Sequence, residues 1–279
     1  MPTDPIDRPI PGEPIAEGRI AEIHAWESGR VLKLARDWVP EEWVDYEFKI
    51  GRIVHAAGLD VPEPFELVRV DGRTGIVYSR VDGPTMLDRL AVSPLKARFY
   101  GRMLGGLHAE MHAKTGAAEL PDGAERLRRK IASVDGAPAV YRETALETAA
   151  GLPHGDALLH GDFHPGNVVL AEHGPVAIDW PDAARGHPLA DVARTVILIS
   201  LGGLPANPIL RLSVGLLRTA FRSGYYAAYF RRSPHRRSEL APWMFPVLFA
   251  RLSEGIEAER ESTRRWLGRL RPDLEPRAG

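Results

Sequence analysis

Cysteine is absent from the 279-residue chain. Disulfide bonds, a thiol nucleophile and a thiolate zinc site are therefore excluded. An excess of either charge is also lacking, because 36 Lys and Arg residues face 37 Asp and Glu residues and leave a formal net charge of −1. A chain with so small a net charge has no overall field that attracts nucleic acid or an anionic membrane, so we expect neither as a partner.

Long hydrophobic runs are lacking as well. The longest apolar stretches, near residues 196–204 and 243–250, fall short of the roughly 18 residues that a membrane span needs. Residues 1–14 contain four prolines in the first eleven positions and no apolar core of a signal peptide, so we expect an extended lead-in. We therefore predict a cytoplasmic protein, and the composition, 44% hydrophobic and 26% charged, is typical of a globular one.

The stretch from 158 to 180, LLHGDFHPGNVVLAEHGPVAIDW, concentrates polar groups around a predicted hairpin. Two short apolar runs, residues 168–170 and 176–178, are separated by five residues that include a glycine and a proline. When the residues nearest the turn pair with each other, Asn167 faces Asp179 across the open end. A carboxylate and an amide oxygen side by side suit a hard cation such as Mg²⁺.

The order of these groups is His160-Gly161-Asp162, then four residues, Asn167, the hairpin and Asp179. This is the order of a kinase catalytic loop followed by a metal-binding aspartate. HGDFHPGN followed by AIDW resembles the aminoglycoside phosphotransferase and choline kinase family, the small-molecule branch of the protein-kinase-like fold. The resemblance implies an α+β protein with a small N-terminal antiparallel sheet lobe and a larger, mainly helical C-terminal lobe. It also implies ATP- and Mg²⁺-dependent phosphoryl transfer to a hydroxyl of a small molecule, with Asp162 catalytic and with Asn167 and Asp179 as metal ligands.

This stretch also fits two other classes of site. The GDFH segment also resembles the opening motif of metallophosphoesterases, which use a two-metal site. That class needs further histidine and aspartate clusters downstream, including a Gly-Asn-His step, and the sequence contains none. His160 and His164 could also bind zinc, but we interpret His160 as a packed structural residue.

A lysine and a glutamate are predicted to meet in the N-terminal lobe. Residues 15–35 alternate in the manner of an antiparallel meander, and the third strand places Lys33 on a face shared with apolar neighbours. A helix is expected from about 40 to 58, with Glu47 on its apolar stripe. A carboxylate there needs a partner, and Lys33 is the obvious one. In the resembled family such a pair holds the nucleotide phosphates, so Lys33 and Glu47 are candidate ATP-binding residues. A third interpretation is a nucleotide-binding pseudokinase that acts only through interaction. The presence of Lys33, Asp162, Asn167 and Asp179 opposes it.

Three more positions are candidate nucleotide contacts. The turn between the first two strands contains Gly18 in place of a G-x-G-x-x-G motif, so Gly18 is its candidate phosphate-covering residue. Two strands are predicted within residues 65–79, and by resemblance backbone groups from Ser79 to Val81 contact the adenine edge. The expected domains are therefore the lead-in, an N-terminal nucleotide-binding lobe (15–82) and a C-terminal catalytic and acceptor-binding lobe (83–279).

The second lobe offers fewer motifs. A helix at about 94–114 has a predicted core stripe with a spacing of four: Phe99, Met103, Leu107 and Met111. His108 and His112 in the same helix have a spacing that zinc sites use, but the intervening glutamate of the protease motif is missing, so we interpret them as structural. Asp191, early in a later helix, matches a family position that braces the catalytic loop; stabilisation of the helix dipole is the alternative.

The acceptor is expected to bind near the C-terminal helices. Residues 115–157 indicate one basic helix within loops, and the region after Leu204 indicates further helices. From Pro205 onward fourteen arginines face seven acidic residues, which does not favour a polycationic acceptor. Glu254, Glu257 and Glu261 are predicted to share a helical face, either salt-bridged to nearby arginines or open to a cationic acceptor. We expect a small hydroxylated acceptor, an amino alcohol, sugar or aminoglycoside-like compound.

Overall fold

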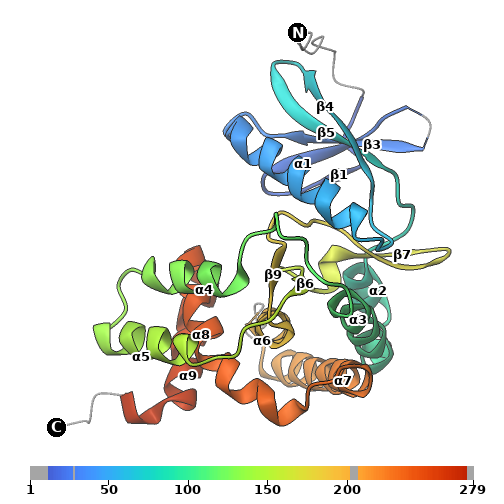
Figure 1. Cartoon of the computed structure of the whole chain (residues 1–279). Helices are drawn as coiled ribbons and strands as arrows, with labels where there is room; N and C mark the ends of the chain where they lie inside the picture. The colour runs from blue at the N-terminus through green and yellow to red at the C-terminus, as the bar shows by residue number, and fades with distance from the viewer. Residues whose placement is uncertain (1–11, 28, 202–206, 275–279) are drawn as a thin grey trace. The chain divides into compact units, whose positions relative to one another are not determined.

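The computed structural model describes residues 12–27, 29–201 and 207–274 (Figure 1). The first eleven residues of the predicted lead-in lie outside the described residues. The chain forms two compact units. The first unit contains the residues up to Pro84 together with Val169–Pro181, and the second contains Thr85–Val168 and the residues from Asp182 onward.

The first unit is built on a five-stranded antiparallel sheet with the order β1-β2-β3-β5-β4. Its strands are β1 (Ala16–Glu17), β2 (Ala21–Ala25), β3 (Arg30–Ala35), β4 (Pro64–Val70) and β5 (Arg73–Ser79). The Asp71-Gly72 turn joins β4 to β5 with φ values of 50° and 71°, the left-handed conformation that two-residue hairpin turns favour. The predicted strands are confirmed.

Helix α1 (Glu41–Ala56) packs on the face of the sheet that carries Lys33. Acidic residues in its first turn favour the start of a helix, because they face the positive end of the helix dipole. Val44 on this helix packs against Ala35 and Ile76 of the sheet. The helical period then carries Glu47 to the buried side of α1, as the sequence predicts.

The hairpin after the HGD motif is formed by β7 (Val168–Ala171) and β8 (Gly174–Ala177). The predicted five-residue connection is wrong, because Gly174 and Pro175 begin the second strand and only two residues form the turn. The facing of Asn167 and Asp179, which was inferred from this hairpin, stays a prediction.

The chain passes from one unit to the other more than once. The predicted domains have a single boundary after residue 82 and therefore leave out the return of the chain to the first unit. The Leu170 N–H donates to the carbonyl of Pro84 at 2.9 Å. Gly83, with φ of 148°, lies against the Leu170 backbone, where a Cβ would overlap the carbonyl oxygen. These contacts place the hairpin residues from Val169 onward with the first unit.

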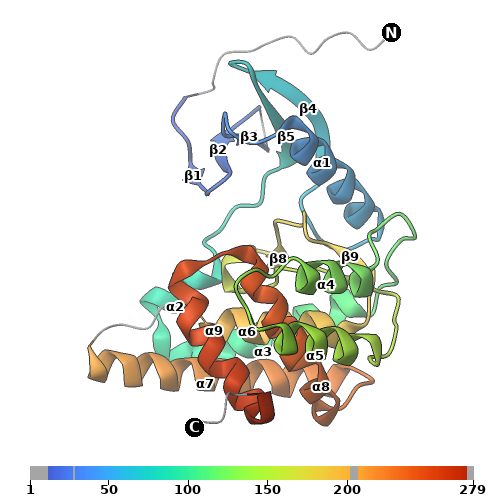
Figure 2. The same ribbon diagram turned by 90° about the vertical axis from the view of Figure 1, so that its left-hand side faces the viewer.

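The second unit is mainly helical (Figure 2). Its α-helices are α2 (Met86–Val92), α3 (Ala97–His112), α4 (Gly123–Ala132), α5 (Ala139–Ala150), α6 (Pro188–Leu201), α7 (Pro208–Arg232), α8 (Ala241–Arg251) and α9 (Glu257–Leu270). A short antiparallel pair, β6 (Ala157–Leu159) and β9 (Ala184–Gly186), lies among them. Helix α5 occupies a region that we expected to be a loop, and that expectation is wrong. Its apolar residues are spread around the helix without a clear stripe, so the sequence carries no helical period there. Among the described residues, no helix is both long enough and apolar enough to cross a membrane.

Helices α3 and α7 lie side by side in the second unit (Figure 2). The core stripe predicted for α3 holds for Met111, which is buried, and is wrong for Phe99, which is 50% exposed. The buried face also includes Tyr100, Leu104 and His108. Glycines determine which face of α3 is buried against α7. A Cβ on Gly105 would overlap the backbone carbonyl oxygen of Tyr225 on α7, so the two helices can approach this closely only where α3 has glycine. A stripe defined by large apolar residues misses such a face.

Candidate active site

Lys33 lies on β3 under α1, and its side chain is 16% exposed. The Lys33 Nζ donates to Glu47 Oε1 at 2.7 Å and to Asp179 Oδ1 at 2.8 Å. Burial alone would lower the pKa of Lys33, but the two carboxylates raise it above its usual value. The ion pair predicted from the sequence is present, and the lysine keeps its charge at neutral pH.

Glu47 has a second donor that the sequence analysis missed. The hydroxyl of Tyr78 donates to Glu47 Oε1 at 3.2 Å. Burial and the nearby carboxylate of Glu47 raise the pKa of Tyr78, so the hydroxyl remains protonated. Tyr78 lies two residues after Ile76 in β5 and therefore shares the face of the strand that packs on α1. That strand position is the signal in the sequence that identifies it. Two donors satisfy a carboxylate that is 9% exposed.

Asp179 lies just after β8 with a φ of 66°, in the left-handed region that residues other than glycine rarely adopt. Such backbone strain is concentrated at functional sites. One carboxylate oxygen accepts the bond from Lys33, and the side chain is 42% exposed. The first unit therefore presents a partly accessible carboxylate beside a buried ammonium group.

The turn that contains Gly18 is held by a side chain. The guanidinium of Arg36 donates to the Gly18 carbonyl from Nε at 3.2 Å and from Nη2 at 3.1 Å, and Nη2 also pairs with Glu17. The Gly18 N–H donates to the Ala21 carbonyl at 2.8 Å. The N–H of Gly18 is therefore engaged within the turn and is not available to a ligand.

Ser79 and Val81 lie at the end of β5 and in the segment after it. The Ser79 N–H donates to Glu63 and the Arg80 N–H to Gly29, each at 2.9 Å. Among the backbone N–H groups from 79 to 81, all in the described part of the chain, that of Val81 is the one left without an acceptor. Of the two predicted hinge residues, Val81 is therefore the one that offers a free donor.

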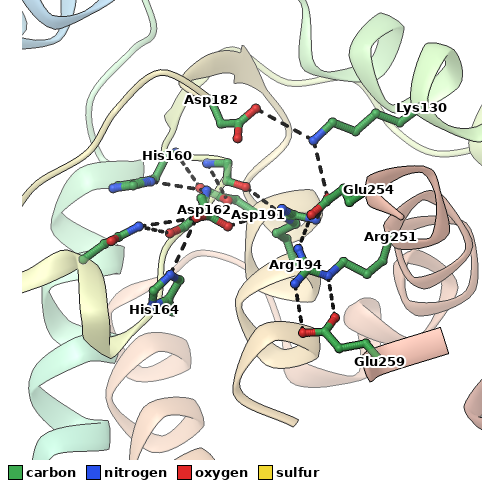
Figure 3. A network of polar contacts seen from close by, with 12 residues as sticks. Lys130, His160, Asp162, His164, Asp182, Asp191, Arg194, Arg251, Glu254 and Glu259 are labelled. Carbon is green, nitrogen blue, oxygen red and sulfur yellow. Dashed lines mark hydrogen bonds and ion pairs between the residues drawn. The ribbon is translucent and has the colours of Figure 1, made fainter. Parts of the chain in front are cut away.

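Asp162 lies in the second unit, in the loop between β6 and the 3₁₀ helix η2 (Pro165–Asn167) (Figure 3). Its side chain is 31% exposed, with Arg194 Nη2 at 3.3 Å and His164 Nε2 at 3.6 Å from its oxygens. Burial would raise the pKa of Asp162, but His164 and Arg194 hold it below its usual range. Asp162 is therefore an ionised carboxylate that can accept a proton.

Asn167 is oriented by Asp162. Its Nδ2 donates to the Asp162 carbonyl at 2.9 Å and approaches the Asp162 carboxylate at 3.4 Å. The amide oxygen then points away from these acceptors and has no donor among the described residues. An amide fixed in this way offers an oxygen ligand.

The backbone of the HGD segment is fixed by Asp191 on α6. The N–H groups of His160 and Gly161 donate to the Asp191 carboxylate at 2.6 and 3.0 Å. Gly161 has a φ of 80°, and a Cβ there would overlap the carbonyl oxygen of Asp182, so glycine is required. The interpretation of Asp191 as a brace for this loop is confirmed, and His160 is fully buried.

A chain of ion pairs continues from Asp162 into the C-terminal helices (Figure 3). Arg194 on α6 donates from Nε to the Gly161 carbonyl at 2.9 Å, and its terminal nitrogens reach Asp162 and Glu254. Glu254 also pairs with Arg251, which in turn pairs with Glu259 at 2.8 Å. The catalytic-loop carboxylate is therefore connected through Arg194 to side chains 60 and more residues further on.

Glu254 does not share a helical face with Glu257 and Glu261, so that prediction is wrong. It ends the 3₁₀ helix η4 (Leu252–Glu254), and Gly255 with φ of 64° separates this turn from α9. Of the predicted partners, Arg265 lies 3.4 Å from Glu261 on the exposed surface. The break in the helix frees Glu254 to turn toward Arg194.

The ion pair between Lys33 and Glu47 predicts non-additive mutational effects. Lys33→Ala and Glu47→Ala should each weaken ATP binding, because either change leaves a buried charge without this partner. The double variant should cost less than the sum, with a coupling of about 0.5–3 kcal/mol. Isothermal titration of ATP into the four proteins measures this coupling. Lys49→Ala is the control, because Lys49 is exposed on the same helix as Glu47, and its effect should add to that of Lys33→Ala. Additive effects of Lys33→Ala and Glu47→Ala would refute the coupling.

A sheet unit with a buried lysine–glutamate pair and a helical unit with a braced HGD loop define a kinase-like phosphotransferase. The chain belongs to the phosphotransferase enzyme family (APH), whose sequence profile matches residues 12–240. The resemblance inferred from the sequence is thereby confirmed, and the protein is a small-molecule phosphotransferase. Among curated proteins, none matches the sequence.

Solved structures of several kinases share this fold. The amicoumacin kinase hAmiN, in complex with AMP-PNP and Ca²⁺, is 14% identical with a TM-score of 0.60, and the match covers 94% of this chain and 86% of that one. A thermostable mutant of the aminoglycoside phosphotransferase APH(4)-Ia, with ADP and hygromycin B, is 16% identical with a TM-score of 0.63, covering 96% and 94%. A choline/ethanolamine kinase family protein from Mesorhizobium loti is 16% identical with a TM-score of 0.58, covering 95% and 88%. At these identities the likeness shows the fold, which is the predicted two-lobe kinase-like α+β fold.

Proposed function

We propose that this enzyme transfers the γ-phosphoryl group of ATP to a hydroxyl group of a small molecule with the help of Mg²⁺. The observation that carries the proposal is Asp162: an ionised, partly exposed carboxylate on a loop whose backbone is fixed by Asp191. Similar structures in complex with AMP-PNP and Ca²⁺, or with ADP and hygromycin B, support this assignment.

The first unit supplies the nucleotide contacts. Lys33 carries a positive charge, and the carboxylates of Glu47 and Asp179 fix the position of its ammonium group. A lysine held in this way binds phosphate oxygens in kinases. The free N–H of Val81 suits an acceptor nitrogen on the adenine edge, whereas the Ser79 N–H is occupied. The turn that contains Gly18 is the proposed phosphate cover, and its neighbouring amides are the donors because the Gly18 N–H is bonded to Ala21.

Asn167 and Asp179 fit a Mg²⁺ ion in their chemistry. Asn167 offers an amide oxygen because its nitrogen is committed to Asp162, and Asp179 offers a carboxylate that is 42% exposed. Mg²⁺ binds such oxygen ligands and substrate phosphates rather than all-protein cages. When bound, Mg²⁺ neutralises charge on the phosphate oxygens.

The catalytic role of Asp162 is to orient the acceptor hydroxyl and to accept its proton late. Phosphoryl transfer passes through a loose transition state that demands little activation of the nucleophile, so a weakly basic carboxylate suffices. Arg194 and the Asn167 amide hold Asp162 in place, which lowers the cost of orienting it in the transition state. Positioning and charge neutralisation then account for most of the acceleration.

The acceptor is proposed to be neutral or to carry a single positive charge. The carboxylates of the network beside Asp162 are already paired within the chain: Asp182 with Arg126 and Lys130, and Glu254 with Arg194 and Arg251. A polycation would have to displace several of these internal cations. Of the four cations in this described network, Lys130 has the longest distances to its partners, 3.8 Å to Asp182 and 3.7 Å to Glu254, so a single ammonium group could replace it.

The test is ATP turnover, with and without Mg²⁺, across a panel of choline, ethanolamine, neutral sugars, kanamycin and hygromycin B. We expect Mg²⁺-dependent phosphorylation, with a higher kcat/KM for amino alcohols or sugars than for the polycationic antibiotics. Efficient use of kanamycin alone would refute the proposed acceptor class and leave the reaction intact. Tight ATP binding without turnover on any acceptor or on water would instead favour the pseudokinase interpretation.

A further inference from the structure

A second polar layer lies behind the HGD loop in the second unit. It consists of His108 and His112 on α3, Tyr225 and Tyr229 on α7, and Asp191 on α6. The side chains of both tyrosines and of His108 are fully buried, and Asp191 is 2% exposed. Polar groups at such depth need partners, and these five residues supply one another's hydrogen bonds.

His108 accepts one hydrogen bond from Tyr225 and donates another to Asp191. Asp191 is buried, which would raise its pKa, but His108 and His112 hold that pKa well below the usual range, so its ionised carboxylate can only accept. The Nε2 of His108, 3.2 Å from Asp191 Oδ2, is therefore the protonated nitrogen. Burial lowers the pKa of His108 to about 3, so the ring is neutral and Nδ1 is an acceptor. The Tyr225 hydroxyl, 2.7 Å away, donates to it.

His112 repeats this arrangement one helical turn further on. Its Nε2 lies 3.4 Å from the same oxygen of Asp191, and its Nδ1 lies 2.7 Å from the Tyr229 hydroxyl. Burial raises the pKa of Tyr229, which keeps that hydroxyl protonated as a donor. The spacing of four in both helices matches the two histidines with the two tyrosines.

The close approach of α3 and α7 brings the tyrosines within reach. Gly101 and Gly105 on α3 face the backbone carbonyls of Phe221 and Tyr225, and a Cβ at either glycine would overlap them. Without side chains at these positions the helices pack at short range, so the Tyr225 hydroxyl reaches across to the histidine three residues after Gly105. The glycines therefore serve the polar layer as well as the packing.

We propose that Tyr225 and Tyr229 are positioning residues for the catalytic loop, acting through His108 and His112 on Asp191. Each hydroxyl fixes its histidine as the Nε2–H tautomer, and the two N–H groups hold the Asp191 carboxylate against the N–H groups of the loop. The inference rests on the proposed function only in that this loop carries the catalytic Asp162.

A metal site is the rival explanation. The ligand atoms of His108, His112 and Asp191 lie within 4.8 Å of one another. A divalent cation would need the Nε2 lone pairs, but both Nε2 atoms point at a carboxylate that also accepts the His160 N–H at 2.6 Å. The hydrogen-bond directions favour the brace.

The experiment compares Tyr225→Phe, Tyr229→Phe and the double variant with Tyr226→Phe, in the full chain. Tyr226→Phe is the matched control, because it removes a hydroxyl from the same helix outside the polar layer. Amide hydrogen exchange of His160 and Gly161, followed by NMR without nucleotide or acceptor, should accelerate about five- to tenfold in the test variants, the effect of losing one hydrogen bond. The control should match the wild type. Exchange at wild-type rates in Tyr225→Phe and Tyr229→Phe would overturn the proposal. If the double variant does not fold, the two single variants still provide the test.

Two further measurements separate the alternatives. With ATP and the preferred acceptor, the test variants should lose about fivefold or more in kcat with KM for ATP unchanged, whereas a purely structural role lowers the melting temperature alone. Stoichiometric Zn²⁺ binding to the wild type that His112→Gln abolishes would overturn the brace in favour of a metal site. Because the exchange experiment needs no turnover, a failure of the proposed function would leave its result valid.

Discussion

Asp162→Asn is expected to lower kcat by about 10² to 10⁴, the usual contribution of a general base, while the dissociation constant for ATP barely changes. The variant keeps the size of the side chain but removes its charge and its capacity to take the acceptor proton. The fold should survive, because Arg194 retains Glu254 and Asn167 retains the Asp162 carbonyl as partners. The measurement is kcat with the preferred acceptor together with the ATP dissociation constant from titration.

Asp156→Asn is the matched control, since Asp156 is an exposed aspartate in the same unit. It should leave both constants unchanged. Loss of ATP binding by Asp162→Asn, with the circular dichroism spectrum intact, would make Asp162 a metal ligand. A near-normal kcat would remove it from the mechanism.

The parts of the site that the sequence predicts are those with short-range patterns. The HGD motif, its asparagine and the aspartate after the hairpin lie within one stretch of chain, and their order identifies the family. Lys33 and Glu47 are further apart, yet each lies on a regular element whose period determines its facing. The strands and most helices follow from the same periods.

Other parts have no such pattern. Arg194 meets Asp162 and Glu254 across separations of 32 and 60 residues, and nothing in the local sequence of any of them indicates the contact. The polar layer of histidines and tyrosines depends on a glycine face of α3 that a search for large apolar residues overlooks. These contacts arise from helix packing in the second unit, which sequence periodicity does not determine.

Asp179→Asn is expected to remove the Mg²⁺-dependent tightening of ATP binding. Its carboxylate is the proposed anionic ligand of the metal, and metal stabilisation of the transition state is worth several kcal/mol, about 10³-fold in rate. Asparagine is the better substitution because Asp179 has a φ of 66°, which asparagine tolerates and alanine does not without strain. Lys33 keeps Glu47 as a partner at 2.7 Å, so the ammonium is not left unpaired.

The measurement is the ATP dissociation constant with Mg²⁺ and with a chelator. For the wild type Mg²⁺ should lower this constant, whereas for Asp179→Asn the two values should coincide. Asp45→Ala, an exposed change on α1, should behave as the wild type. If Asp179→Asn kept the full Mg²⁺ effect, the metal would be held elsewhere, and the strained backbone of Asp179 would serve only to place a carboxylate beside Lys33.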